Sequence, residues 1–240
     1  MVRPDFMRVL LVVAHPDDEI LAAGGASHRW ASKGWEVVPC ILSAAAEARA
    51  HRPDASQLRD DMLRACREVG MGVPIEGSFP NIAMNTVPHL DLVQFIEGAI
   101  DAVTPSVIVT HHPGDVNDDH QQTSRACQAA SRRYQRLQRS ERLGGLLYAE
   151  VLSSTDWSFA SNTSSFEPTA FVELREVDFE AKVRALASYR GVMRPHPHPR
   201  STESLRALAT LRGSQAGMAL AEAFQVAHLD ASRLPELGDA

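Results

Sequence analysis

The chain of 240 residues has only three cysteines, which lie far apart at Cys40, Cys66 and Cys127. This odd, scattered set fits neither a disulfide framework nor a cysteine zinc site, and it predicts a reduced, cytoplasmic protein. A basic excess is also missing, since 24 Lys and Arg stand against 30 Asp and Glu and the net charge is −6. We therefore expect no nucleic-acid partner, because such a partner needs a basic surface.

Long apolar runs are absent as well. The longest runs fall short of the ~20 residues that span a bilayer, so we expect no membrane span. The first residues lack the apolar run and cleavage site of a signal peptide. The first apolar run is not followed by Gly-x-Gly-x-x-Gly, which argues against a nucleotide-binding turn. Hydrophobic residues still make up 44% of the chain, enough for a sizeable core, and we expect one domain over residues 1–240.

Short apolar runs alternate with helical patterns in the first part of the chain. The apolar runs predict strands, of which the third is short, at 8–14, 35–42, 73–79 and 106–110. The helical patterns between and after them cover 20–33, 57–69, 88–103 and 121–139. This alternation predicts an α/β fold with a Rossmann-like, mostly parallel sheet and flanking helices, whose core is residues 1–140.

The pattern changes after Gly145. Further strands are predicted at 146–152 and 170–174, and helical patterns cover 179–189, 201–211 and 219–224. We therefore expect a C-terminal α/β extension over residues 145–230 that contributes to the substrate pocket. The polar loop at 153–169 and the proline-rich segment at 194–200 are the expected walls of that pocket.

Two of the predicted strands end in loops rich in histidine and acidic residues. His15-Pro-Asp-Asp-Glu19 follows the first strand, and His111–His120 follows the fourth. Ligand sites in open α/β sheets lie past the carboxyl ends of the strands, so the two loops are expected to meet. A catalytic zinc typically has three protein ligands and an open position. His15, Asp18 and His120 offer two imidazoles and a carboxylate for such a site.

Asp17 is the remaining acid beside this predicted metal site. Zinc lowers the pKa of a bound water to ~7, and a carboxylate within hydrogen-bond reach can take its proton. Taken singly, these residues have structural explanations: Asp17 or Glu19 can cap a helix and complement its dipole, and His120 can begin one. Two acidic, histidine-bearing loops at matched sheet positions are not explained by capping. The residues therefore favour a site for zinc or another divalent metal.

Ala14-His-Pro-Asp-Asp-Glu19, followed by Gly24-Gly25, resembles the signature of the LmbE/PIG-L family of zinc-dependent N-deacetylases, and Thr110–His120 resembles its second metal motif. The likeness continues through Phe79–Asn81, Asn85–His89, Ser154–Trp157 and Arg194–Ser201. The resemblance implies a Rossmann-like sheet, zinc held by His15, Asp18 and His120, and Asp17 as general base. It also implies that acetate is released from an N-acetylated amino sugar or its conjugate.

One position departs from the family pattern. Many members have a histidine three residues before the last ligand, where it stabilises the oxyanion or protonates the leaving amine, and this chain has Asn117. Asparagine can donate a hydrogen bond to an oxyanion but supplies no proton at neutral pH. His196 and His198, between prolines that stiffen the segment, are candidates for the acid, as is Asp17 once protonated. The alternative for this segment is a stiff surface connector.

Other polar residues near the predicted site have two interpretations each. His112 is expected to lie behind the metal ligands without binding the metal. Asp115 or Asp119 can orient a ligand histidine. Arg59 can reach a substrate phosphate or hydroxyl, or can be a solvated helix residue paired with an acid. Trp157 can stack on a sugar ring or belong to the core.

The sequence thus predicts a metal-dependent amide hydrolase whose partner is a small N-acetylated sugar, and a homo-oligomer is compatible with it. The nearest alternative is an amidase that removes a larger acyl group from a thiol-sugar conjugate. A non-catalytic sugar-binding module on the same fold is the alternative from another class. The intact set of His15, Asp17, Asp18 and His120 argues against that module.

Overall fold

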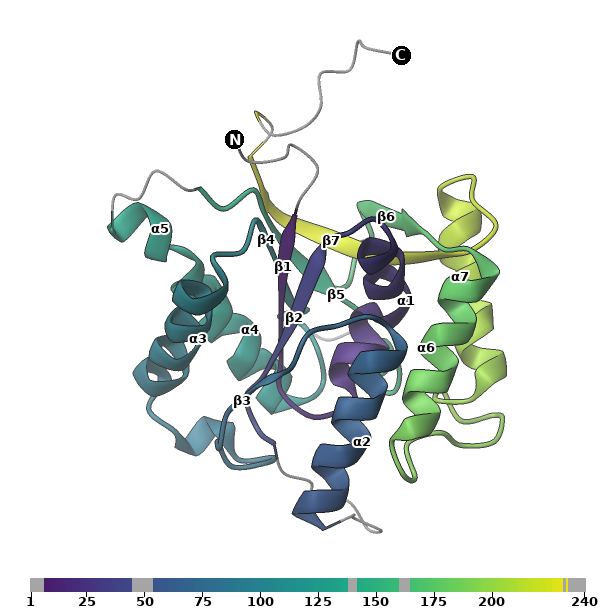
Figure 1. Cartoon of the computed structure of the whole chain (residues 1–240), viewed down its shortest axis with the longest axis horizontal. Helices are drawn as coiled ribbons and strands as arrows, with labels where there is room; N and C mark the ends of the chain where they lie inside the picture. Colours follow the sequence, from purple (N-terminus) through teal and green to yellow (C-terminus); the bar gives the residue numbers. More distant parts are fainter. Residues whose placement is uncertain (1–6, 45–53, 138–141, 160–164, 231, 233–240) are drawn as a thin grey trace.

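Seven strands form one mostly parallel sheet in the computed structural model, which describes residues 7–44, 54–137, 142–159, 165–230 and 232 (Figure 1). The strands are β1 (Arg8–Val13), β2 (Glu36–Ile41), β3 (Ile75–Glu76), β4 (Val107–His111), β5 (Gly145–Ala149), β6 (Ala170–Glu173) and β7 (Ala221–Leu229). Their order across the sheet is β3-β2-β1-β4-β5-β7-β6. The first five pair in parallel, and β7 runs antiparallel to β5 and β6. The predicted α/β fold is confirmed.

Helices cover both faces of this sheet. They are α1 (Asp18–Ser32), α2 (Ala55–Glu68), α3 (His89–Val103), α4 (Asp118–Ser131), α5 (Arg133–Arg136), α6 (Glu176–Ser188) and α7 (Thr202–Gln215), with 3-10 turns η1 (Met84–Thr86) and η2 (Thr155–Trp157). Figure 1 shows α3 and α4 on one face and α1, α2, α6 and α7 on the other. None of the helices in the described part of the chain is both long and apolar enough to cross a bilayer.

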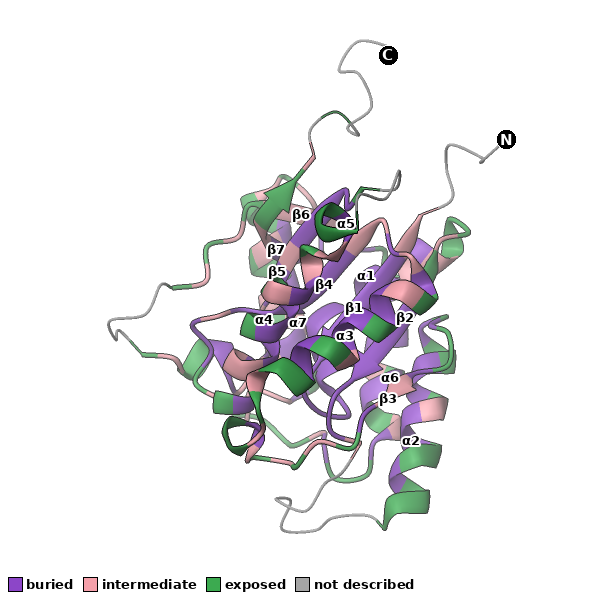
Figure 2. Ribbon diagram, turned by 90° about the vertical axis from the view of Figure 1, so that its left-hand side faces the viewer, coloured by how far each residue is buried: buried purple, intermediate pink, exposed green. Residues whose placement is uncertain are grey.

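The first strand lies in the middle of the core. It pairs with β2 on one side and β4 on the other, and its residues are buried from Val9 onward (Figure 2). Leu10 and Val12 pack into the apolar cluster under α3 and α4, whereas Leu11 and its alternate neighbours pack into the cluster under α1 and α6. A strand buried on both faces needs apolar side chains at every position, which is why this run shows no polar alternation.

The chain reverses its direction across the sheet between β1 and β4. From β1 it proceeds outward through β2 to β3, and it then returns to place β4 on the other side of β1. Two adjacent parallel strands whose connections leave in opposite directions open a crevice at their carboxyl ends. The loops after β1 and β4 therefore meet, as their sequences predict.

Three local predictions need correction. The helix predicted at 219–224 is wrong, because Ala221–Leu229 is strand β7, paired with β5 and β6. A short apolar run fits either period, and here two partner strands decide the outcome. The third strand shortens to Ile75–Glu76, and the helix predicted at 121–139 divides into α4 and α5, with its last two residues outside the described part. The three cysteines are free and buried.

Candidate functional site

The turn between β1 and α1 brings three acidic or imidazole groups together. The amide of Asp18 donates to the carbonyl of His15 (N···O 3.2 Å), and Asp18 is the first residue of α1. Asp17 has a left-handed backbone (φ 95°), a conformation that is strained for a residue with a side chain. The carboxylate of Glu19 accepts a hydrogen bond from the Asp17 amide (3.0 Å). The strained turn is thus held by its own neighbours.

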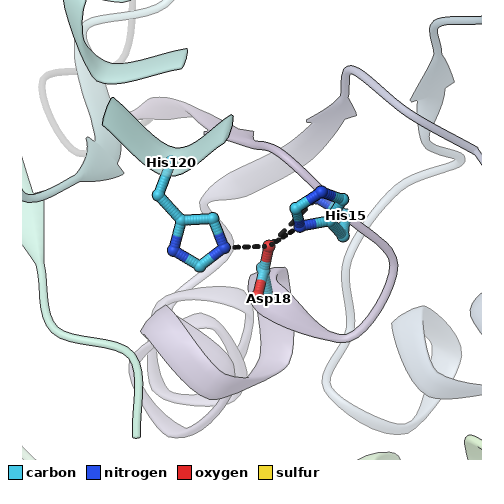
Figure 3. A group of neighbouring side chains, drawn as sticks. All are labelled: His15, Asp18 and His120. Atoms are coloured by element: carbon cyan, nitrogen blue, oxygen red, sulfur yellow. Dashed lines mark hydrogen bonds and ion pairs between the residues drawn. The ribbon is translucent and has the colours of Figure 1, made fainter. Parts of the chain in front are cut away.

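The predicted metal ligands converge on one carboxylate oxygen. Asp18 Oδ2 lies 3.1 Å from Nε2 of His120 and 3.3 Å from Nδ1 of His15 (Figure 3). His120 comes from the first turn of α4, so the group joins the ends of β1 and β4. All three side chains are buried, and one ligand atom from each lies within 4.8 Å of the other two. Such a group can hold a divalent ion.

Two further carboxylates orient the imidazoles toward this point. Nε2 of His15 bonds Asp119 Oδ2 at 2.8 Å, and Nδ1 of His120 lies 3.1 Å from Asp115 Oδ2. These bonds direct the other nitrogen of each ring toward Asp18. Histidine ligands in metal sites are commonly held this way, with a carboxylate on the far nitrogen. The residues present therefore fit a zinc-type site, and the orienting role expected for Asp115 or Asp119 applies to both.

The orienting carboxylates also tie neighbouring loops to the site. Asp119 accepts hydrogen bonds from the backbone amides of Ile82 (2.6 Å) and Met84 (2.9 Å). Asp115 accepts bonds from the hydroxyls of Ser154 and Thr155, the latter at 2.7 Å. The loops after β3 and β5 are thereby fastened to the loop after β4.

The electrostatics of the cluster favour a positive charge at its centre. Burial alone would lower the pKa of His120, but the charge of Asp18 and the hydrogen bond to Asp115 outweigh it and raise that pKa to about 10. Burial likewise opposes ionisation of Asp115, but the hydrogen bond from His120 lowers its pKa to about 2. Hydrogen bonds to Asp119 and Asp18 overcome burial and raise the pKa of His15. A bound cation would take the place of these protons.

A second, overlapping group contains His111, Asp115 and His120. His111 stacks on His120 with ring centroids 3.8 Å apart, and its Nε2 accepts a hydrogen bond from the Ala14 amide (2.8 Å). Burial lowers the pKa of His111 to about 3, which leaves the ring neutral. Because its Nε2 lone pair is already used, His111 supports His120 by stacking, and the group around Asp18 is the better metal site.

A cavity of about 200 Å³ opens beside the ligand group. It is lined by His15, Asp17, Asp18, Asn81, Ile82, Asn117, His120, Ser153, Ser154 and Arg200. Asp17 occupies the N-cap position of α1, but its side chain makes no capping hydrogen bond. Instead, Asp17 Oδ2 accepts a bond from Nη1 of Arg200 (3.1 Å). Capping therefore does not explain the carboxylate of Asp17, which belongs to the wall of the cavity.

Asn117 has a structural role as well as a place in the cavity wall. Its Oδ1 accepts a hydrogen bond from the Asp119 amide (2.9 Å) and caps α4. Within the described residues its side-chain nitrogen has no hydrogen-bond partner, so it can serve as a donor to a ligand in the cavity.

His196 and His198 are not among the residues that line the cavity. His196 is exposed, and Nδ1 of His198 accepts a hydrogen bond from the Arg200 amide (3.0 Å). Partial burial and the charges of Arg200 and Arg194 lower the pKa of His198, which opposes a role as proton donor at neutral pH. The proline-rich segment does reach the site, but through Arg200.

The other polar residues considered from the sequence lie at different places. Arg59 is 60% exposed at its side chain and pairs with Glu76 (3.0 Å), as expected for a solvated helix residue. His112 is buried but does not line the cavity. Trp157 is 45% exposed, and its ring meets that of His198 with centroids 6.4 Å apart. Residues 160–164 of the predicted loop at 153–169 lie outside the described part.

Sequence reasoning missed Arg200 and Ser154 as parts of this site. Both lie in segments expected to wall the pocket and in stretches where the family likeness continues, but that likeness assigned neither residue a role. The stacked His111 was missed too, and the only available signal was its place directly at the end of an apolar run.

The chain is similar to a known protein family over its first half. A family model described as GlcNAc-PI de-N-acetylase (PIG-L) matches residues 10–131, just over half of the chain. The matched segment contains the three predicted ligands and Asp17, whereas Ser154 and Arg200 lie beyond it. No curated protein sequence matches the chain.

Solved structures share the fold at low sequence identity. An N,N'-diacetylchitobiose deacetylase from Pyrococcus horikoshii has a TM-score of 0.72 at 16% identity, over 97% of this chain and 88% of its own. A 4-carboxy-2-hydroxymuconate hydratase from Pseudomonas putida KT2440 has a TM-score of 0.73 at 18% identity, over 98% and 99%. A deacetylase of teicoplanin biosynthesis has a TM-score of 0.69 at 16% identity, over 91% and 97%. The fold alone therefore does not select the reaction, and the site residues must.

Proposed function

The chain belongs to the GlcNAc-PI de-N-acetylase (PIG-L) family, and from that premise we propose that it is a zinc-dependent hydrolase that removes the N-acetyl group from an amino sugar or amino-sugar conjugate. The observation that carries the proposal is the convergence of His15, Asp18 and His120 beside a cavity that also contains Asp17. Deacetylases of an acetylated disaccharide and of teicoplanin biosynthesis share the fold, which supports the reaction class.

The metal would be held by His15, Asp18 and His120. A divalent metal at such a site supplies Lewis acidity, which polarises an amide carbonyl and lowers the pKa of water to ~7. Asp119 and Asp115 hold the two imidazoles in the orientation that this requires.

Asp17 would act as the general base and then as the acid. Its carboxylate lies in the cavity wall directly beside Asp18, and it takes a proton from the attacking water. The same proton is then available for the amine as the carbon–nitrogen bond breaks. This assignment needs no proton from Asn117, which lines the cavity and whose side-chain nitrogen would donate a hydrogen bond to the oxyanion. In this mechanism neither His196 nor His198 is needed as the general acid.

The proposed substrate is an N-acetylated sugar. Part of it would enter the cavity of about 200 Å³, and the remainder would stay in solvent. A larger acyl group is the main alternative for the bond that is cleaved. A non-catalytic sugar-binding module would not need a buried group of potential metal ligands with a further carboxylate beside it.

Metal content and product analysis test the proposal together. Purified protein and a His120→Ala variant are compared for zinc content, and the zinc-loaded protein is then given N-acetyl and matched N-hexanoyl amino sugars. We expect one zinc per chain, lost in the variant, and acetate with a free amine from the acetyl substrates. Faster cleavage of the hexanoyl series would indicate the amidase. A metal-loaded protein that hydrolyses no amide would overturn the proposal and leave the hydratase-like use of this fold open to test.

A further inference from the structure

One cationic side chain, that of Arg200, reaches the cavity from the loop between α6 and α7. Arg200 follows α6 and lies beyond the segment that the family model matches. Its Nη1 donates to Asp17 Oδ2 (3.1 Å), and its Nε donates to the Ser153 hydroxyl (2.9 Å). It is the one Lys or Arg among the described residues that line the cavity. The carboxylate assigned as the base thus bonds a residue outside the two motifs that contain the proposed metal ligands.

The backbone around Arg200 is built to hold this side chain in place. The Arg200 amide donates to Nδ1 of His198 (3.0 Å), and its carbonyl accepts a bond from the Arg194 amide (3.2 Å). Directly after it, Ser201 caps α7 by accepting a bond from the Ser204 amide (3.1 Å). The backbone that carries the Arg200 guanidinium is therefore part of a hydrogen-bonded loop.

Both acceptors of the guanidinium have unusual backbones. Asp17 (φ 95°) and Ser153 (φ 68°) are two of the four non-glycine residues with positive φ in the described part of the chain. Such conformations are unfavourable for residues with a side chain and persist where the surroundings impose them. The two strained residues come from the loops after β1 and β5, and Arg200 bridges them.

A general base needs more than proximity to the reacting water. Its oxygen must lie within about 2.6–3.2 Å of the water oxygen whose proton it takes, and a carboxylate free to rotate meets this requirement only part of the time. A guanidinium is planar and presents its N–H groups in a fixed fork, so Arg200 can bond Ser153 and Asp17 at once from one rigid group, which an ammonium group does less well. The side chain of Asp17 is 3% exposed and that of Arg200 24% exposed, so their contact is largely shielded from water.

We propose that Arg200 is a positioning residue for Asp17: its guanidinium, braced on Ser153, holds the Asp17 carboxylate in the orientation in which it accepts the proton. The inference rests on the proposed function, since it assigns Asp17 the role of base. It adds to that function a residue that the matched family segment does not contain.

Steady-state kinetics of zinc-loaded Arg200→Ala and Arg200→Lys test this role. Misplacing a reacting group by about 1 Å can cost about 10²-fold, so we expect kcat of Arg200→Ala to fall by about 10–100-fold. We expect KM and zinc content to stay near the wild-type values. Millimolar guanidine should restore part of the lost kcat in Arg200→Ala, which a purely structural defect would not show. Arg200→Lys should recover only part of the rate, because an ammonium group lacks the planar fork.

Two comparisons give the kinetics a reference. Arg194→Ala removes an exposed guanidinium from the same loop, and Arg194 uses only its backbone amide toward Arg200, so wild-type kinetics are expected. In an Asp17→Asn background, Arg200→Ala should cause little further loss of kcat, because the group that it positions is already gone. A wild-type kcat in Arg200→Ala, or a rise in KM with kcat unchanged, would overturn the proposal.

A melting experiment on metal-free protein tests the contact without activity. The shifts in melting temperature of Asp17→Asn and Arg200→Ala should be non-additive in the double variant, by about 2–4 °C. Additive shifts would show that the two side chains do not interact and would overturn the inference. A wild type that binds zinc but cleaves no amide would overturn the proposed function instead, and the melting cycle would then decide the Arg200–Asp17 contact by itself.

Discussion

Two buried polar clusters each include residues of helix α1, and they differ in whether their polar groups face only one another or face a cavity. The first, here called the metal cluster, consists of His15, Asp18, His120, Asp115 and Asp119 at the start of the helix. The second, the kink cluster, consists of Lys182, Glu222 and the amides of Gly25 and Ala26 in the middle of the helix.

The kink cluster is closed. Ala23 leaves the helical conformation (φ −150°), so the amides of Gly25 and Ala26 begin a new helical segment and need acceptors. The two carboxylate oxygens of Glu222 accept them at 3.0 and 2.6 Å. Lys182 donates to Glu222 (2.6 Å) and to the Leu21 carbonyl (2.8 Å). The cavity beside this cluster has a volume of only about 20 Å³, which is too small for a ligand.

The metal cluster is open at its centre. One nitrogen of each imidazole contacts an orienting carboxylate, and the other nitrogen lies near one oxygen of Asp18. The cavity beside this point is about ten times larger than the cavity beside the kink cluster. Buried charge is therefore not by itself the mark of a functional site. What separates the two clusters is whether ligand atoms converge on a point that a small molecule can reach.

The largest expected effect comes from the base beside the metal cluster. Asp17→Asn should lower kcat by about 10²–10⁴-fold, the usual contribution of general acid–base catalysis, because an amide takes no proton from water. Zinc content should stay at the wild-type value, since Asp17 is not among the three ligands. Kinetics with acetate detection, beside metal analysis of the same sample, check this. A near-normal rate would show that another group is the base.

The kink cluster should respond in stability and not in chemistry. Glu222→Ala leaves Lys182 buried without its partner and two amides without acceptors, so the free energy of unfolding should fall by about 3–5 kcal/mol. The zinc content and kcat of the remaining folded protein should be unchanged. Urea unfolding measures the first quantity.

Glu173→Ala is the matched control for that variant, because Glu173 is exposed on the neighbouring strand β6. It should shift the free energy of unfolding by less than about 0.5 kcal/mol. If Glu222→Ala lost its metal while staying fully folded, the separation between the two clusters would be wrong.

A smaller effect is expected from the residues behind the metal ligands. Asp119→Asn should weaken zinc binding by about 10–100-fold, as is typical when such an outer partner is changed. Asp119 accepts three donors, from His15, Ile82 and Met84, and an asparagine would turn an NH₂ group toward at least one of them. Competition with a chelating dye measures the affinity. The adjacent, exposed Asp118→Asn is the control and should bind zinc as the wild type does; equal affinities in both variants would contradict the role of Asp119.

The smallest effect is expected at Asp178 on α6. Like Glu222 in the kink cluster, its buried carboxylate has all its hydrogen bonds to neighbouring protein groups named below. This buried carboxylate accepts bonds from the Arg175 amide (2.8 Å), the Arg175 guanidinium and His28 (2.6 Å). Burial opposes its ionisation, but these bonds outweigh burial and lower its pKa from 3.8 to about 2. Its stabilisation is therefore present above pH 4 and is lost as the pH falls through about 2.

Asp178→Asn should accordingly cost about 1–3 kcal/mol of unfolding free energy at pH 7, and the gap to wild type should narrow between pH 4 and pH 2. Urea unfolding at pH 7, 4 and 2.5 measures both quantities. A gap that stays constant with pH would show that the carboxylate charge is not what stabilises this cluster.

The metal cluster was largely predictable because its members follow apolar runs. His15 and Asp18 come directly after β1, and His120 follows the loop after β4, so locating two buried strands was enough to bring them together. The kink cluster gave no such signal. Glu222 lies in a short apolar run that also fits a helix, and its partners Lys182 and Gly25 are separated from it by 40 and 197 residues.

Local features of the sequence are enough to predict the parallel core of the fold, the edge of the sheet at which chemistry can occur, and three proposed ligands with a neighbouring acid, because hydrophobic period and strand ends are local properties. The packing of distant segments sets which nitrogen of each histidine faces Asp18 and brings Arg200, rather than His196 or His198, to Asp17. It also places Asn117 where it caps a helix and lines the cavity. These are contacts between residues up to 183 positions apart. Their geometry depends on how the C-terminal loops pack against the sheet, and no local pattern in the chain encodes it.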